Sequence, residues 1–227
     1  MPSNNGLPHV INLLSSLESW VDKTNFHIAT DSCLIEHVVS KAGYQCVITP
    51  EAMNGTERIA MAVRDNQYLH ADWIINIQGD LINVDKSIGD QILNGIYAAE
   101  ESGATYVTYA STKPYLTKDS KNQGSVWVQV NSKNHLALDF GRAQKPELTD
   151  GSLLHSHIGV YAYKVQTLIK YLGLNVTDRE LTLSLEQMRF VDNEIFPFIA
   201  YLDQAPLEVN TEEDQINRLI REENYGE

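Results

Sequence analysis

Apolar and polar positions along the chain follow two spacings, one typical of strands and one typical of helices. Short apolar runs rich in β-branched and aromatic residues predict strands at 26–30, 45–49, 73–78, 105–110, 126–130, 136–140 and 157–163. Apolar residues three and four positions apart predict helices at 34–42, 56–63, 88–101 and 183–191, and a last helix that Thr211 would cap. Asp31 or Ser32 is expected to cap the helix at 34–42, and Gly43 is expected to end it.

The order of these elements predicts an α/β fold. Strands and helices alternate through the first half, which favours a mainly parallel sheet, and the strand at 73–78 is apolar enough to be covered on both faces. The segments at 126–130 and 136–140 predict a hairpin around Asn131. The loop at 144–152 is either a mobile lid or an ordinary surface loop, and the loop at 113–124 is expected to be an ordinary surface loop. We expect residues 1–227 to form a single domain.

Composition excludes several classes of protein. The chain has 17 basic and 30 acidic residues, a net charge of −13, and no basic run, so neither nucleic acid nor an anionic membrane surface is an expected partner. No apolar run approaches the roughly 18 residues of a membrane span. The two cysteines are expected to be free thiols, and the first residues do not resemble a signal peptide. We therefore expect a cytoplasmic protein.

Two groups of residues are candidates for chemistry. Asp80 directly follows the apolar strand at 73–78, where a carboxylate can hold Mg²⁺ on the phosphates of a nucleotide; the alternative is that it caps the next turn or helix. His157 and Tyr161 lie four residues apart on one predicted strand, so they share a face with Gly159. A histidine on an apolar strand is, alternatively, an ordinary core residue.

Several segments together resemble one family. The segments are Asn54–Arg58, Gln78–Asp80, Phe140–Arg142, His157–Tyr161, Leu185–Arg189 and Val209–Asp214. In this order and spacing they resemble the 3-deoxy-manno-octulosonate (Kdo) cytidylyltransferases over nearly the whole chain. The resemblance implies a three-layer nucleotide-diphospho-sugar transferase fold, which is Rossmann-like with a mixed, mainly parallel sheet, and a hairpin insertion through which family members form homodimers. It also implies transfer of CMP from CTP to Kdo or a related 3-deoxy-2-ulosonic acid, with Mg²⁺ as cofactor, as in the activation of lipopolysaccharide or capsule sugars.

The resemblance also assigns roles to individual residues. The implied nucleotide-binding residues are Asn54, Gly55, Thr56, Arg58 and Gln78. The implied sugar-acid-binding residues are Arg142, His157, Tyr161, Glu186 and Gln187. Asp80 and Arg142 are the implied catalytic residues, and Asp80 and Asn210 the implied metal ligands. Without the resemblance, Glu186 and Gln187 would suit an exposed helix face and Arg142 a surface ion pair.

Three departures from the family pattern fall on the nucleotide side. The family's first strand and its nucleotide-binding loop have no counterpart before Asn5. Leu81 and Ile82 replace an acidic residue and a proline, and Asn210 replaces an aspartate, which removes a charge from the metal site. In the family the first strand lies between those matching 26–30 and 73–78, so we expect these two to meet directly or to receive a strand from elsewhere. The chain is a shortened enzyme, a working transferase with altered metal binding, or a non-catalytic relative that binds a sugar acid or a protein partner.

Overall fold

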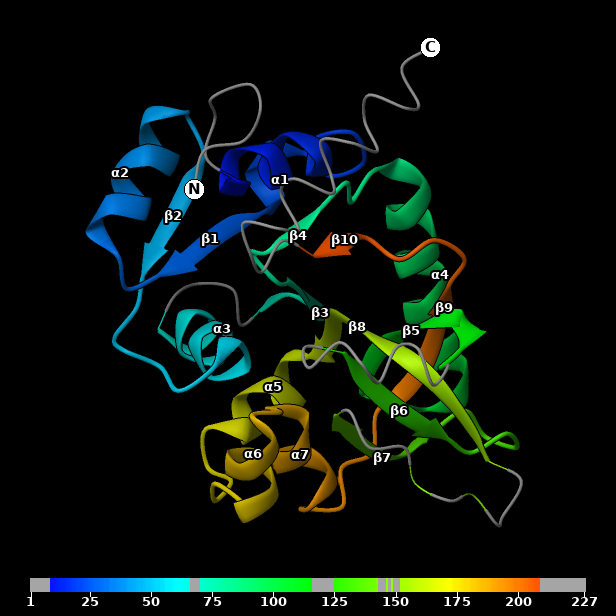
Figure 1. Cartoon of the computed structure of the whole chain (residues 1–227). Helices are drawn as coiled ribbons and strands as arrows, with labels where there is room; N and C mark the ends of the chain where they lie inside the picture. The colour runs from blue at the N-terminus through cyan, green and yellow to red at the C-terminus, as the bar shows by residue number, and fades with distance from the viewer. Residues whose placement is uncertain are drawn as a thin grey trace.

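Figure 1 shows helices packed around a twisted sheet, with a small pair of strands set apart from it. The computed structural model describes residues 9–65, 70–115, 125–142, 146, 148 and 152–208. The helices are α1 (His9–Leu17), α2 (Cys33–Lys41), α3 (Gly55–Arg64), α4 (Lys86–Ser102), α5 (Val165–Tyr171), α6 (Asp178–Leu183) and α7 (Gln187–Val191), with a 3₁₀ turn at Lys23–Asn25. The strands are β1 (His27–Thr30), β2 (Gln45–Ile48), β3 (Trp73–Ile77), β4 (Leu81–Ile82), β5 (Tyr106–Pro114), β6 (Val126–Val130), β7 (Ala137–Arg142), β8 (Leu153–Lys164), β9 (Phe198–Leu202) and β10 (Leu207–Glu208).

The long strand β8 organises the main sheet. β5 runs antiparallel along one of its edges, while β6 and β3 share the other edge, with β6 opposite 153–156 and β3 opposite 160–164. β9 joins β5 in parallel, and β7 pairs with β6 in antiparallel. The sheet is therefore mixed, as expected, and within the described ranges its one parallel pair is β5–β9. The expected hairpin is confirmed and consists of β6 and β7.

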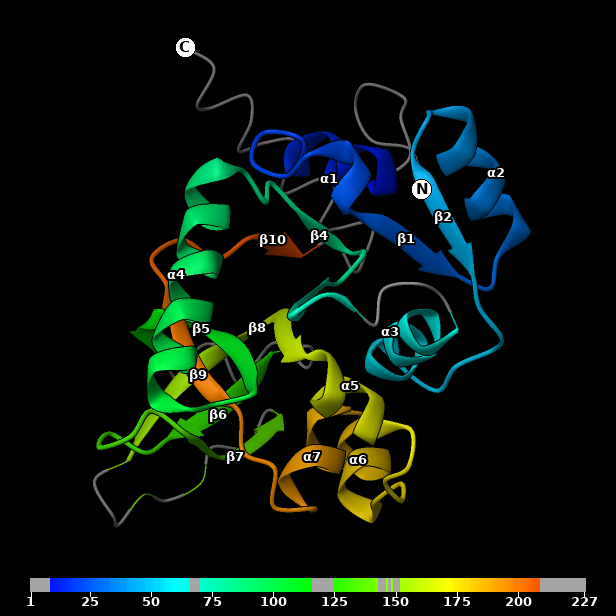
Figure 2. The same ribbon diagram turned by 180° about the vertical axis from the view of Figure 1, so that it is seen from behind.

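Helices cover both faces of this sheet and give the expected three layers. Ile158, Val160 and Ala162 of β8 face a core made with α1 and α4, whereas Tyr161 and Tyr163 face a core made with α3, α5 and Phe190. Figure 2 shows α4 lying along β5 and β9 from behind. This alternation follows from the two-residue period of a strand, and it explains why β8 is apolar on both sides. None of the helices in the described ranges has the length and apolar content needed to cross a membrane.

Strands β1 and β2 form a separate parallel pair. Within the described ranges β1 pairs only with β2, and β3 pairs only with β8, so the strands expected to flank a missing neighbour do not meet. The β1–β2 pair is covered by α2 and α1 through a small core around Ile11, Leu14 and Val39. Its position beside the larger sheet is visible at the upper left of Figure 1.

Local sequence signals account for most helix ends. The Ser32 hydroxyl accepts a hydrogen bond from the Ile35 amide and caps α2, and Gly43 follows this helix with φ +80°. Asp85 caps α4, and Gly103 at φ +77° ends it. Both glycines occupy the left-handed region that other residues avoid.

Three predicted elements differ from the structure. Asn54, predicted to begin a turn, caps α3, which starts at Gly55. The predicted helix at 183–191 is divided, because Ser184 adopts φ +51° and separates α6 from α7. The strand predicted at 157–163 begins earlier, at Leu153. The helix expected after Thr211 lies outside the described residues, and so do most residues of the loop at 144–152.

Candidate functional site

The N-terminus of α3 lies at the centre of the residues singled out from the sequence. Asn54 caps the helix by accepting a hydrogen bond from the Glu57 amide at 2.9 Å through its side-chain oxygen. The amide group of the same side chain donates to the Tyr171 hydroxyl at 2.8 Å and to a Glu180 carboxylate oxygen at 3.0 Å. Both the oxygen and the nitrogen of the Asn54 side chain are therefore hydrogen-bonded, which fixes the direction in which α3 begins.

The Glu186 carboxylate joins three elements at this point. It accepts hydrogen bonds from the Thr56 amide at 2.8 Å and from the Gln78 side-chain amide at 3.2 Å. Gln78 follows β3 and lies so close to Gly55 that a Cβ added there would meet its side-chain nitrogen at 2.9 Å. Burial raises the pKa of the Glu186 carboxyl, which the Thr56 amide partly offsets. The structure thus brings together Asn54, Gly55, Thr56 and Gln78, which the resemblance assigns to the nucleotide, and Glu186, which it assigns to the sugar acid.

A buried ion pair stabilises the cluster of Asn54, Thr56, Gln78 and Glu186. The Arg189 guanidinium donates to both Glu180 carboxylate oxygens, at 2.6 and 2.7 Å, and it stacks over the Tyr171 ring at 4.2 Å from the centroid. Arg189 is 2% exposed and Glu180 is 5% exposed. Because Glu180 also holds Asn54, the pair connects α6 and α7 to the start of α3.

His157 is held as a neutral ring on the central strand. Its Nε2 lies 2.8 Å from the Thr108 hydroxyl oxygen, and that hydroxyl donates its one proton to the Val160 carbonyl at 3.0 Å. The hydroxyl must therefore accept from Nε2–H, which leaves Nδ1 as an acceptor. Burial, with a contribution from Arg142, lowers the pKa of His157 to about 3. Tyr161 lies on the same face with ring centroids 5.5 Å apart, as the sequence predicted.

Arg142 lies near this ring, on the hairpin, and Gln187 is the first residue of α7. The Arg142 guanidinium donates to the backbone carbonyls of Leu183 at 2.8 Å and Ser184 at 3.2 Å, and so reaches from β7 to the end of α6. Gln187 is 2% exposed, and its side-chain nitrogen has no hydrogen-bond partner among the described residues. A buried donor of this kind is costly unless a ligand or water accepts from it.

Asp80 follows β3 and is exposed at the carboxyl end of that strand. The structure explains why residues 81 and 82 are apolar. Leu81 and Ile82 form β4 opposite β10 and are each 1% exposed within the core. Across the described part of the chain, no three histidine, cysteine or acidic side chains are grouped closely enough to hold a metal. Asp80 alone suits a cation held largely by substrate phosphates. Asn210 lies outside the described residues.

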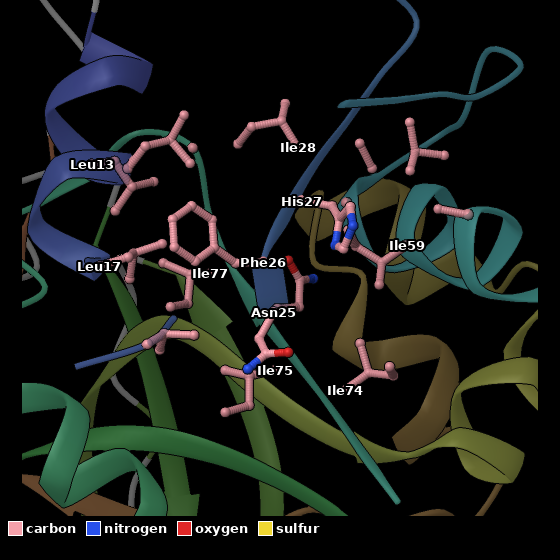
Figure 3. Close-up of a pocket in the computed structure, with 18 of the residues that line it drawn as sticks. Leu13, Leu17, Asn25, Phe26, His27, Ile28, Ile59, Ile74, Ile75 and Ile77 are labelled. Atoms are coloured by element: carbon pink, nitrogen blue, oxygen red, sulfur yellow. The ribbon is translucent and has the colours of Figure 1, made fainter. Parts of the chain in front are cut away.

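Arg58 points away from the Glu186 cluster. Its guanidinium donates to the Thr49 hydroxyl at 2.8 Å and to Asp31 at 2.9 Å. It lines one end of a cavity of about 850 Å³ between β1 and β3, together with Gly55, Gln78 and Gly79. Figure 3 shows the apolar side chains along this cavity, which we call the interstrand cavity.

Sequence reasoning assigned no role to Glu180, Tyr171 or Thr108. Threonine is an ordinary residue in a strand, so Thr108 gives no sign of a special role. Its partner His157 lies 49 residues away in the sequence. Glu180 and Arg189 are nine residues apart across a break between two helices, so no helical spacing relates them. No signal in the sequence marked this pair, because Glu180 directly follows the charged Asp178 and Arg179.

Comparisons with known proteins agree with this arrangement. Residues 13–197 match the model of a family described as Cytidylyltransferase. The chain is 31% identical over 204 residues to a 3-deoxy-manno-octulosonate cytidylyltransferase of Chlorobium phaeovibrioides, which covers 86% of this chain and 80% of that protein. It is 31% identical over 195 residues to the enzyme of the same name from Rickettsia africae, covering 83% and 74% respectively. Among solved structures, a CMP:2-keto-3-deoxy-manno-octonic acid synthetase complexed with CTP superposes with a TM-score of 0.79 at 22% identity, covering 96% of this chain and 89% of that one.

Proposed function

Because the chain belongs to the cytidylyltransferase family, we propose that it transfers CMP from CTP to Kdo, with release of pyrophosphate. The observation that carries this proposal is the extent of the match, since the family model covers residues 13–197 and the Chlorobium relative is matched over 80% of its length. In the reaction the 2-hydroxyl of the sugar acid attacks the α-phosphorus of CTP, and the bond to the pyrophosphate breaks. The same comparisons favour this activity over a sugar-acid-binding protein without catalysis.

The sugar acid is proposed to bind beside His157. The neutral ring offers Nδ1 as an acceptor for a sugar hydroxyl, and the unpartnered amide of the buried Gln187 offers a donor. The Arg142 guanidinium supplies positive charge for the carboxylate, with Tyr161 and Glu186 completing the pocket. Catalysis then consists mainly of positioning and of stabilising charge on the phosphates.

The nucleotide is proposed to bind along the start of α3 and the end of β3. Asn54, Gly55 and Thr56 present a rigid helix N-terminus, and Gln78 is held against Gly55. The Thr56 and Glu57 amides at this N-terminus already donate to Glu186 and Asn54, so the positive charge for the phosphates would come from a side chain. Arg58 contributes charge from the same helix.

We propose Asp80 and Asn210 as the ligands of Mg²⁺. Strand β10 runs antiparallel to β4, from Leu207 opposite Ile82 to Glu208 opposite Leu81, and is therefore directed toward Asp80. When bound, the cation would neutralise phosphate charge in the transition state. Asp80 would contribute one carboxylate to the cation, and Asn210 would contribute one neutral amide oxygen.

The metal proposal predicts opposite effects on activity for two substitutions. Asp80→Asn is expected to lower activity at least about a hundredfold, because it removes the remaining ligand charge. Asn210→Asp is expected to raise activity when Mg²⁺ is limiting. Asp90→Asn, which changes a carboxylate exposed on α4, is the matched control and should leave activity unchanged.

The experiment that tests the activity is pyrophosphate release by the purified chain with CTP, Mg²⁺ and Kdo. Release that requires the sugar is the expected result. A folded sample that releases no pyrophosphate at saturating substrates, while still binding Kdo in calorimetry, would instead support the non-catalytic alternative.

We also propose that the chain forms a homodimer through the β6–β7 hairpin. β7 is the outer strand of the main sheet in the described part of the chain, so it is available for pairing. Light scattering should give a mass of twice 25.5 kDa. Substituting the exposed Leu138 on this hairpin by lysine should shift that mass toward the monomer.

A further inference from the structure

The pairing between β5 and β8 is interrupted beside the candidate sugar pocket. Thr108 lies opposite Tyr161, and the register then shifts. The shift leaves Gly159 and Val160 as extra residues on β8, in a β-bulge. Bulges change the direction of neighbouring side chains and are frequent next to active sites. Here the Thr108 side chain reaches both the Val160 carbonyl and the His157 ring.

The Val160 carbonyl sets the direction of the Thr108 hydroxyl. The two oxygens are 3.0 Å apart. Oxygens this close repel each other unless a hydrogen lies between them, and a carbonyl oxygen carries none. The hydroxyl therefore donates to Val160, and its oxygen is left to accept from His157 Nε2 at 2.8 Å. Because the hydroxyl has a single hydrogen, Nε2 carries the ring proton and Nδ1 carries none.

Thr108 is too deeply buried to touch a ligand itself. It is 0% exposed, whereas His157 is only partly buried. The rings of Phe140 and Tyr161 flank the imidazole with centroids at 5.4 and 5.5 Å, and they hold its plane. Any influence of the Thr108 hydroxyl on a bound molecule must therefore act through His157.

His157 and Arg142 offer a ligand two different kinds of group. Nδ1 presents a lone pair and no hydrogen, so it accepts from a hydroxyl and repels an ether, keto or carboxylate oxygen in the same place. The Arg142 guanidinium lies close enough to this ring to help lower its pKa, and it supplies positive charge for a carboxylate. A sugar acid carries both a carboxylate and hydroxyls, so the two side chains together would orient it.

We propose that Thr108 is a positioning residue, which holds the proton of His157 on Nε2 and so makes the pocket select a ligand hydroxyl at Nδ1. The identity of the ligand rests on the proposed function, whereas the position of the proton is a property of the chain alone. The proton can be located without CTP or Kdo. A chain with the proton on Nε2 that released no pyrophosphate would contradict the proposed function and not the role of Thr108.

Nitrogen NMR of the full chain, labelled at its histidine nitrogens, locates the proton directly. His157→Gln identifies the His157 signals among those of the seven histidines. We expect the proton on Nε2, with slow exchange against water, because it is hydrogen-bonded inside the sheet. Thr108→Val keeps the shape of the side chain but removes the acceptor, so this exchange should become at least about tenfold faster.

Two further variants control for the loss of the hydroxyl. Thr108→Ser restores it and should keep the slow exchange of the unchanged chain. Thr105→Val makes the same chemical change at an exposed position just before β5, and it should leave the His157 signals unchanged. Circular dichroism would check that the variants are folded.

Calorimetry with Kdo tests whether the position of the proton matters to a ligand. Thr108→Val is expected to weaken Kdo binding about tenfold, which corresponds to the loss of about one hydrogen bond. The Kd of CTP should change by less than about twofold, because a change confined to His157 does not reach the proposed nucleotide site. Thr108→Ser should bind Kdo within about threefold of the unchanged chain.

A double-variant cycle shows whether Thr108 acts through His157. In a His157→Phe background, which keeps a ring but no acceptor, Thr108→Val should change the Kd of Kdo by less than about twofold. Kdo analogues with single hydroxyls replaced by fluorine test the selection itself. One of them should bind the unchanged chain about tenfold or more weakly than Kdo, because fluorine has no hydrogen to donate, and this difference should disappear in His157→Phe.

Three results would overturn the inference. One is a proton on Nδ1 of His157 in the unchanged chain, a result that does not depend on whether any variant folds. Another is the same exchange rate in Thr108→Val and Thr108→Ser. The third is an equal loss of Kdo affinity on Thr108→Val with and without His157, which would make Thr108 a residue of packing alone.

Discussion

Glu180 and Arg189 are single residues on which the cluster around α3 depends. Breaking a buried pair by removing one partner typically costs about 3–5 kcal/mol, because the other charge stays buried. Arg189→Met is expected to destabilise the chain by this amount in urea unfolding. The double variant Glu180→Gln with Arg189→Met should recover at least about 1 kcal/mol, since no lone charge remains.

The control for the ion pair is Arg179→Met. Arg179 pairs with Asp192 at 2.8 Å and also with Asp139, but its side chain is 46% exposed. Exposed pairs contribute about 0–1 kcal/mol, so this variant should be nearly as stable as the unchanged chain. If the double variant is as unstable as Arg189→Met alone, the loss comes from packing around Tyr171 and not from the charge.

His157 makes stability depend on pH. Its pKa is lowered to about 3 in the folded chain from an ordinary value of 6.5, so the unfolded chain binds a proton that the folded chain does not. The stability contribution is therefore complete above pH 6.5 and is lost as the pH falls toward 3. Between pH 7 and pH 5 the loss from this residue is about 2 kcal/mol.

The measurement is urea unfolding at both pH values for the chain and for His157→Gln. Glutamine can still donate to Thr108 but does not titrate, so the variant should lose about 2 kcal/mol less on acidification. The other six histidines are common to both chains and cancel in the comparison. An identical pH dependence in the two chains would show that His157 titrates normally.

At the scale of elements, α4 lies close to the sheet because Gly95 has no side chain. A Cβ at this position would meet the Ala200 Cβ at 2.6 Å and a Tyr109 ring carbon at 2.8 Å. Helix propensity alone predicts that Gly95→Ala stabilises α4 by about 1 kcal/mol. We expect instead a net loss of about 1–3 kcal/mol, because overpacking against the sheet outweighs propensity.

The matched control on the same helix is Asn94→Ala. Asn94 is exposed, so only propensity changes, and a gain of a few tenths of a kcal/mol is expected. Thermal unfolding of the two variants should therefore shift Tm in opposite directions. A rise in Tm for both would mean that α4 can move away from β5 and β9 at little cost.

At the scale of the whole molecule, the β1–β2 pair and the main sheet should differ in local stability. The pair has two short strands and a small core, whereas β8 is paired along both edges and buried between two larger cores. Amides of β1 and β2 should therefore exchange about tenfold or more faster than those of β5 and β8 in native-state hydrogen exchange. Equal rates in both regions would indicate that the molecule opens only as one unit.

Much of the fold could be predicted because it depends on local patterns. The β6–β7 hairpin follows from alternating residues around a polar turn, and α2 and α4 follow from helical spacing with a cap and a glycine at their ends. The break at Ser184 could not be predicted in this way, because apolar spacing continues through it. Strand β9 was not predicted either, although its apolar run lies between Pro197 and Asp203.

The sequence by itself indicated candidates for the site, and it determined that His157 and Tyr161 share a face, because strand period is a property of the chain alone. Only the tertiary structure decided that Glu180 and Arg189 support Asn54, that His157 stays neutral, and that β1 and β3 face each other across a cavity. These features arise between residues far apart in the chain. Their energies depend on burial and on distance in space, neither of which is encoded in the spacing of residues along a sequence.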